Sequence, residues 1–338
     1  MDSSPSTDQN FISNTWAYTY GKTIPKNKHP TASGQVVNPN IRKPCASTTS
    51  TVEHIIIIIS ENHSFDSIYG RYCQAATGSR PTCNIGPSCC EAASDSCNFS
   101  QNPNLNGARC YKANFASYYS TTIADLLNYC GVHWTFYAEG YDQNPNSTQC
   151  YPNYYDATDD PFTYFPSLIN SSERYSKNFR DYTNLYSDIR AKKLPAVSYV
   201  KGLGIHSEHP AYGTITAGET ISQDVINAIR ASNTYRKNTV IFLVADESGG
   251  YYDHVSPPPN STIDNQPYGP RMPFVAIGHQ IKRNYVSHVQ MEPSSLIKFI
   301  EWNWLNGPPG QLGTRDTVVN NIGDMFDHKK TGVKIPSN

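Results

Sequence analysis

The sequence predicts an α/β fold in which a mostly parallel sheet is covered by helices on both faces. Two apolar, β-branched stretches, 52–60 and 239–245, are typical of strands buried on both faces. The stretch 220–231 has apolar residues at helical spacing. From about residue 185 strand patterns alternate with helix patterns, and this order predicts a parallel sheet. The length of 338 residues suits one large α/β domain or about two domains.

The strands and helices can be predicted in chain order. A helix over 122–129 ends at Cys130-Gly131, where glycine is a frequent helix terminator. Ile221, Val225, Ile226 and Ile229 form one face of the helix over 220–231. The closing helix has apolar residues at helical spacing along its length. The predicted strands are 52–60, 132–137, 194–200, 239–245 and 272–277, and the predicted helices are 122–129, 185–192, 220–231 and 293–305.

The chain divides into an α/β domain and less regular segments. Residues 1–50 are polar and predict an irregular arm, residues 51–328 form the domain, and residues 329–338 form a tail. Six of the nine cysteines lie between Cys73 and Cys110, which predicts a cysteine-rich insertion over 71–115 held by disulfides. A zinc site is less favoured because the chain has no CxxC pair. The odd number of cysteines leaves a free thiol or an intermolecular bridge.

Composition excludes several classes of protein. Lys plus Arg number 27 and Asp plus Glu 28, so the chain lacks the basic surface of a nucleic-acid-binding protein. Its longest aliphatic run, Ile55–Ile59, is far shorter than the roughly 20 residues of a transmembrane helix. The cysteines and four N-glycosylation patterns predict a secreted or extracytoplasmic protein, although the chain as given has no signal peptide. These patterns begin at Asn98, Asn146, Asn170 and Asn260.

Acidic residues follow the two most apolar strands. Glu61-Asn62 comes directly after the first, and Asp246-Glu247 comes directly after the other. Ligands of parallel sheets bind at the carboxyl ends of strands, so these side chains should converge if the strands are neighbours. Close carboxylates need shared protons or a cation, and oxygen ligands suit Mg²⁺, Ca²⁺ or Mn²⁺. Either acidic pair alone could instead cap the next helix.

Histidines accompany these acids. His206-Ser207-Glu208-His209 follows the predicted strand 194–200, and Asp253-His254 follows a paired glycine at 249–250. A single histidine is more often structural. Imidazoles beside a hard metal ion could instead bind a phosphate group and supply a proton.

Several ordered segments resemble the phosphoesterase family, which contains bacterial phospholipases C, plant non-specific phospholipases C and an acid phosphatase branch. The stretch 61–70 is similar to its ENxSFDxxxG signature, and 246–255 is similar to its DExGGxxDHV block. Shorter similarities cover an EHP element, a GxRVP strand and a closing helix. These segments are 208–210, 269–273 and 296–301, and the resemblance spans about 52–327.

This resemblance implies a three-layer, alkaline-phosphatase-like α/β/α fold and hydrolysis of phosphoric esters. It implies that the metal is held by Glu61, Asn62, Asp246 and Glu247. His209 and His254 would contact the phosphoryl group, and a hydroxyl would attack it to form a phospho-enzyme. The substrate would be a soluble phosphomonoester or a phospholipid.

The sequence departs from the family where the nucleophile is expected. The family's Gly-rich turn before the GVxWxxY element, here 131–137, has no counterpart. The nearest hydroxyls, Ser117, Ser120, Thr121 and Thr122, lead into a helix that they could cap. An active hydrolase therefore competes with a catalytically impaired relative that still binds phosphate or metal. A structural secreted module is a weaker alternative, because it leaves the acidic pairs unexplained.

Overall fold

A six-stranded sheet forms the centre of the protein, which is described by a computed structural model over residues 45, 47–69, 120–142, 153–169 and 177–338. The strand order is β3-β2-β4-β1-β5-β6. All neighbouring pairs are parallel except β5 with β6, so the predicted mostly parallel sheet is confirmed. The strands are β1 (His54–Ser60), β2 (Trp134–Ala138), β3 (Phe179–Asp181), β4 (Val197–Lys201), β5 (Thr239–Ala245) and β6 (Phe274–Gly278).

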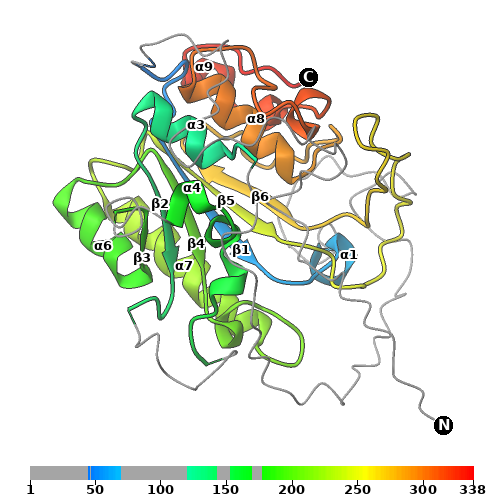
Figure 1. The fold of residues 1–338 in the computed structure, drawn as a ribbon, viewed down its shortest axis with the longest axis horizontal. Coiled ribbons are helices and arrows are strands. Elements are labelled where there is room, and N and C mark those ends of the chain that lie inside the picture. The colour runs from blue at the N-terminus through cyan, green and yellow to red at the C-terminus, as the bar shows by residue number, and fades with distance from the viewer. Residues whose placement is uncertain (1–44, 46, 70–119, 143–152, 170–176) are drawn as a thin grey trace.

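Helices cover both faces of the sheet, as Figure 1 shows. Helices α3 and α8 lie on one face, and α6 and α7 lie on the other, so the predicted three-layer α/β/α arrangement is confirmed. Within the described ranges, none of the helices is both long and apolar enough to cross a bilayer. The helices are α1 (Phe65–Tyr69), α3 (Ile123–Cys130), α4 (Pro166–Ile169), α6 (Tyr182–Ala191), α7 (Ile215–Ala231), α8 (Pro293–Trp304) and α9 (His328–Thr331).

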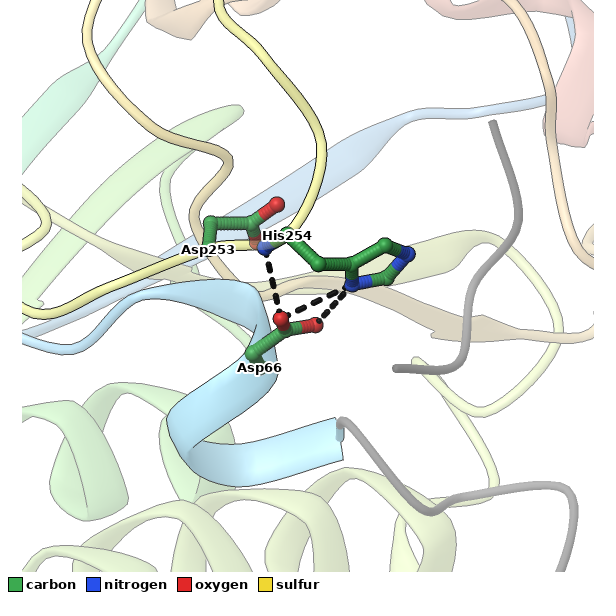
Figure 2. Close-up of side chains that lie close together, drawn as sticks. All are labelled: Asp66, Asp253 and His254. Carbon is green, nitrogen blue, oxygen red and sulfur yellow. Dashed lines mark hydrogen bonds and ion pairs between the residues drawn. The ribbon is translucent and has the colours of Figure 1, made fainter. Parts of the chain in front are cut away.

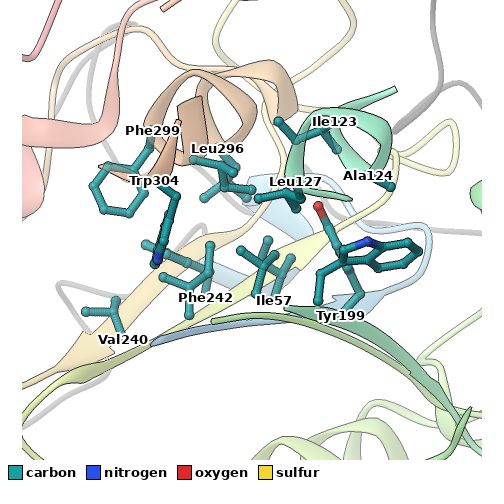
Figure 3. Packing of buried hydrophobic residues seen from close by; sticks show 14 of the residues in the cluster. Ile57, Ile123, Ala124, Leu127, Tyr199, Val240, Phe242, Leu296, Phe299 and Trp304 are labelled. Carbon is teal, nitrogen blue, oxygen red and sulfur yellow. The ribbon is translucent and has the colours of Figure 1, made fainter. Parts of the chain in front are cut away.

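Two hydrophobic cores explain why the strands are continuously apolar. Ile57 of β1 faces the core formed with α3 and α8, shown in Figure 3. Ile56 and Ile58 face the opposite core, which they share with α7 residues such as Val225. Because successive side chains of a strand point to opposite faces, a central strand in this fold needs apolar residues at every position.

The first turns of two helices lie outside their predicted ranges. Helix α7 begins at Ile215 rather than 220, because the Thr214 side chain accepts a hydrogen bond from the Ala217 N–H and caps it. Helix α6 begins at Tyr182 rather than 185, after the N-cap Asp181. The additional turns are largely polar or exposed, so apolar spacing gives no signal for them.

Cys45 and the predicted tail both contact the domain. Most of the predicted arm 1–50 and all of the insertion 71–115 lie outside the described residues. Cys45 forms a disulfide with Cys130 at the end of α3, with the two Cα atoms 5.2 Å apart. The predicted tail begins inside α9, and Ile335 within it is fully buried in the same core as the apolar residues of α8.

Candidate active site

The two acidic pairs meet at one edge of the sheet. Strands β1 and β5 are neighbours in parallel register, with Ser60 opposite Ala245. Glu61 and Asp246 are the next residues of the two strands, and alternation places both on the face that carries Ile59. Glu61 is only 4% exposed. The strand ends therefore bring together the side chains that the sequence predicted as metal ligands.

Asn62 and Glu247 complete an oxygen-rich cluster around Asp246. The Asp246 Oδ1 accepts hydrogen bonds from the backbone N–H groups of Asn62, at 3.2 Å, and Glu247, at 2.7 Å. One orientation of the Asn62 amide places its oxygen 3.1 Å from Glu247 Oε1 and 3.2 Å from Asp246 Oδ1. The other orientation directs its NH₂ group at both carboxylates. Without a cation, hydrogen bonding favours the second orientation, in which the amide oxygen accepts from His209 Nε2. A hard divalent cation would favour the first, in which three oxygens converge, so the residues present fit a metal site in that orientation.

Lys201, which the sequence analysis missed, lies beneath this cluster at the end of β4. Its Nζ forms an ion pair with Glu61 Oε1 and lies 3.9 Å from Asp246 Oδ2. The lysine side chain is 4% exposed. Burial alone would lower the pKa of the Lys201 ammonium, but Glu61, Asp246 and Asp159 outweigh burial and raise the pKa.

Asp246 and Glu247 are harder to ionise than ordinary carboxyl groups. Burial raises the pKa of Asp246 to about 7, with Lys201 opposing the shift and Glu61 adding to it. Burial also raises the pKa of Glu247. Perturbed carboxyls of this kind are frequent where a protein holds a cation or transfers protons.

His209 lies beside the cluster. Its Nε2 is 2.7 Å from the terminal amide atom of Asn62 that points away from the carboxylates. Its Nδ1 is 2.6 Å from the carbonyl oxygen of Pro210. An Nδ1–H donor to this carbonyl would leave Nε2 as the nitrogen directed at the site. His209 therefore lies next to Asn62, and its contact with a phosphoryl group stays a prediction.

His254 belongs to a neighbouring network with Asp66, shown in Figure 2. Its Nδ1 lies 2.8 and 2.9 Å from the two Asp66 oxygens, and its backbone N–H donates to Asp66 Oδ2. Arg271 donates to Asp66 Oδ1 and to Asp253 Oδ1, at 3.2 and 2.9 Å. Asp66 therefore fixes the imidazole, and these hydrogen bonds join His254 to the network of Asp66 and Arg271.

Asp66, Asp253 and His254 also satisfy a geometric criterion for a metal site, because their ligand atoms lie within 4.8 Å of one another. Among the described His, Cys, Asp and Glu residues no other group meets this criterion, and the three carboxylates Glu61, Asp246 and Glu247 do not. The guanidinium of Arg271 already forms ion pairs with both carboxylates. We therefore assign the charge balance there to Arg271.

Two of the described hydroxyls have structural roles. Thr122 caps α3, as predicted, because its Oγ1 accepts from the Asp125 N–H. Ser207 donates to Glu61 Oε2, at 3.3 Å, and to the Gly204 carbonyl, but it is only 1% exposed. Ser117, another hydroxyl considered for the nucleophile, lies outside the described residues.

A large cavity borders the cluster. Its volume is about 1260 Å³, and Asp246 and Glu247 form part of its wall. Apolar side chains line other parts, including Phe65, Met272 and Phe274. The cavity therefore offers an apolar surface next to the carboxylates, with more room than a phosphate group alone requires.

Gly249 lies so close to Asn62 that a side chain at this position would displace Asn62. It has φ +63°, and a Cβ added there would lie 2.4 Å from the Asn62 carbonyl oxygen. We expect Gly249→Ala to displace Asn62 and weaken Mn²⁺ binding about tenfold or more, measured by calorimetric titration. Gly250→Ala is the matched control, because Gly250 has φ +75° but no atom within 4 Å of the added Cβ. Equal affinities of the two variants would contradict this role.

Sequence comparison identifies relatives among phospholipases C. The non-hemolytic phospholipase C of Pseudomonas aeruginosa is 25% identical over 61% of this chain and 33% of its own length. The hemolytic phospholipase C of the same species is 24% identical, with 63% and 33% coverage. Non-specific phospholipase C6 of Arabidopsis thaliana is 30% identical over 25% of this chain and 18% of its own length. The chain thus spans about a third of the length of the bacterial relatives.

Structural comparison finds a protein in the alkaline phosphatase superfamily from Vibrio parahaemolyticus, with a TM-score of 0.39 and 12% identity. The superposition covers 87% of this chain and 78% of that protein. The profile of the phosphoesterase family matches residues 89–305. This match extends over more than half of the sequence and includes the ends of β4 and β5, and on this evidence the chain belongs to the phosphoesterase family.

Proposed function

We propose that this chain hydrolyses phosphoric ester bonds at a divalent metal site formed by Glu61, Asn62, Asp246 and Glu247. The observation that carries the proposal is the position of the Asn62 amide, which lies 3.1 Å from Glu247 Oε1 and 3.2 Å from Asp246 Oδ1. Family membership and phospholipase C relatives support the reaction class. When bound there, Mg²⁺, Ca²⁺ or Mn²⁺ would supply positive charge that stabilises the phosphoryl oxygens.

The protein's own residues would bind and orient the substrate. With Nδ1–H donating to the Pro210 carbonyl, His209 Nε2 would donate a hydrogen bond to a phosphoryl oxygen, or a proton to the leaving group, when the ring is the imidazolium. Asp66 would hold His254 with its proton on Nδ1 and its Nε2 directed away from Asp66. The predicted phospho-enzyme requires a hydroxyl nucleophile, and we assign none of the described hydroxyls to that role.

We further propose that the leaving group of the substrate is a large apolar alcohol, such as the diacylglycerol of a phospholipid. The cavity next to Asp246 and Glu247 supports this proposal, because Phe65, Met272 and Phe274 offer an apolar lining. The Cys45–Cys130 disulfide supports an oxidising, extracytoplasmic location.

Hydrolysis of p-nitrophenyl phosphate and p-nitrophenyl phosphorylcholine tests the function. We expect turnover that depends on Mg²⁺, Ca²⁺ or Mn²⁺, is abolished by chelator, and falls at least about a thousandfold in Asp246→Asn. Asp224→Asn, an exposed carboxylate on α7, is the matched control and should retain full activity.

Metal binding and turnover, measured on the same protein, separate a hydrolase from a relative that only binds metal. Metal binding by folded protein without turnover of either substrate would contradict the hydrolase and favour the metal-binding relative. Turnover that persists in chelator and in Asp246→Asn would contradict the metal site.

A further inference from the structure

A buried positive charge already occupies the inner side of the carboxylate cluster. Lys201 is the last residue of β4, and its register partner on β1 is Ile59, two residues before Glu61. Its side chain lies on the same face of the sheet as Glu61 and Asp246, and it is 4% exposed. A lysine is rarely buried to this extent without a carboxylate partner.

The ammonium divides the cluster into an inner and an outer half. On the inner side, Glu61 Oε1 pairs with Lys201 and Glu61 Oε2 accepts from Ser207. Asp246 Oδ2 faces Lys201 at 3.9 Å, while Asp246 Oδ1 faces Asn62 and Glu247 on the outer side. On the outer side, Asp246 Oδ1 accepts two backbone hydrogen bonds and lies beside the Asn62 and Glu247 side chains, where the metal ion would bind. On the inner side, Lys201 and Ser207 engage the Glu61 carboxylate.

We propose that the Lys201 ammonium acts as a built-in cation that restricts this site to a single divalent ion. This inference rests on the proposed metal site. A second divalent ion between Glu61 and Asp246 would have to occupy the position of Nζ, where two positive centres repel strongly in a buried environment. The lysine also balances the negative charge of the buried Glu61 carboxylate.

Metal stoichiometry of the unmodified protein is the first test and requires no variant. We expect Mn²⁺ titration, followed by dialysis and elemental analysis, to give one ion per chain. Electron paramagnetic resonance should show isolated Mn²⁺ rather than a spin-coupled pair. Two ions per chain, or a coupled-pair signal, would overturn the role of Lys201. No bound ion would overturn the proposed metal site itself.

Replacement of Lys201 by a neutral side chain of similar length is the second test. We expect Lys201→Met to bind a second Mn²⁺, or to bind the first at least about tenfold more tightly, since an ammonium no longer repels it. Its thermal unfolding midpoint should rise more on adding Mn²⁺ than that of the wild type, because the ion replaces the lost charge.

Lys193→Met is the matched control, since Lys193 lies in the connection four residues before β4 and is exposed. It should match the wild type in stoichiometry, affinity and the shift of the midpoint. If Lys201→Met also matches the wild type, the inference is wrong. Should Lys201→Met not fold without metal, refolding in Mn²⁺ gives the same readouts, and the stoichiometry of the wild type still decides.

Discussion

The Asp66→Asn variant is expected to lose about a hundredfold in turnover of p-nitrophenyl phosphate, with His254 no longer held in one tautomer. Asp66 has a fully buried side chain and accepts from three donors: the His254 backbone N–H, His254 Nδ1 and Arg271. An asparagine offers one acceptor oxygen and an NH₂ group, so at least one of these donors would face another donor. Nitrogen-15 chemical shifts of the imidazole report the tautomer directly.

Asp253→Asn is the control for this prediction. Asp253 also pairs with Arg271, at 2.9 Å, whereas the hydrogen bonds of the His254 Nδ1 described above go to Asp66. Both variants remove one buried negative charge beside the same guanidinium. If the two variants lose turnover equally while the His254 tautomer changes only in Asp66→Asn, His254 has no role in the reaction.

The convergence of the acidic pairs could be predicted from the sequence because it depends on two simple regularities. Parallel strands end at the same edge of a sheet, and alternate residues share a face. The register of Ser60 with Ala245 then carries Glu61 and Asp246 to adjacent positions. Their roles as ligands stay a prediction that metal titration can test.

The role of Lys201 was missed, although its position carries a signal. It ends the otherwise mostly apolar strand 197–201, and a charge inside a strand buried on both faces needs a partner. Neither the apolar pattern nor the resemblance to known motifs indicates which carboxylate that partner is. The pairing with Glu61 follows only from the order of β4 beside β1.

Contacts between distant segments could not be predicted either. Asp66 and His254 are separated by 188 positions, and their hydrogen bond depends on how α1 packs against the loop after β5.

The direction of β6 could not be predicted from the sequence either. The connection between β5 and β6 contains no helix, whereas parallel neighbours usually need a helical crossover, but an apolar stretch has the same pattern in either direction.

A buried carboxyl on α8 should make the stability of the domain depend on pH. Glu301 is fully buried, and its oxygens accept from the N–H groups of Gly310, Gln311 and Leu312. Burial and the charge of Asp316 raise the pKa of Glu301 to about 8, although these hydrogen bonds oppose the shift. The folded state therefore binds this proton more tightly than the unfolded state, whose carboxyl has a pKa of 4.5.

The stabilising contribution of Glu301 is fully present below the unfolded pKa and is lost as the pH rises through the folded pKa. Between pH 5 and 8 we expect the wild type to lose on the order of 3 kcal/mol of unfolding free energy more than Glu301→Gln. The glutamine stays neutral, can still accept backbone hydrogen bonds, and can donate to Asp316 as the protonated acid does. Urea denaturation at several pH values measures the difference, with Glu219→Gln on the exposed side of α7 as control. Parallel pH profiles for the wild type and Glu301→Gln would mean that Glu301 is ionised in the folded protein over this range, and that its three backbone donors outweigh burial.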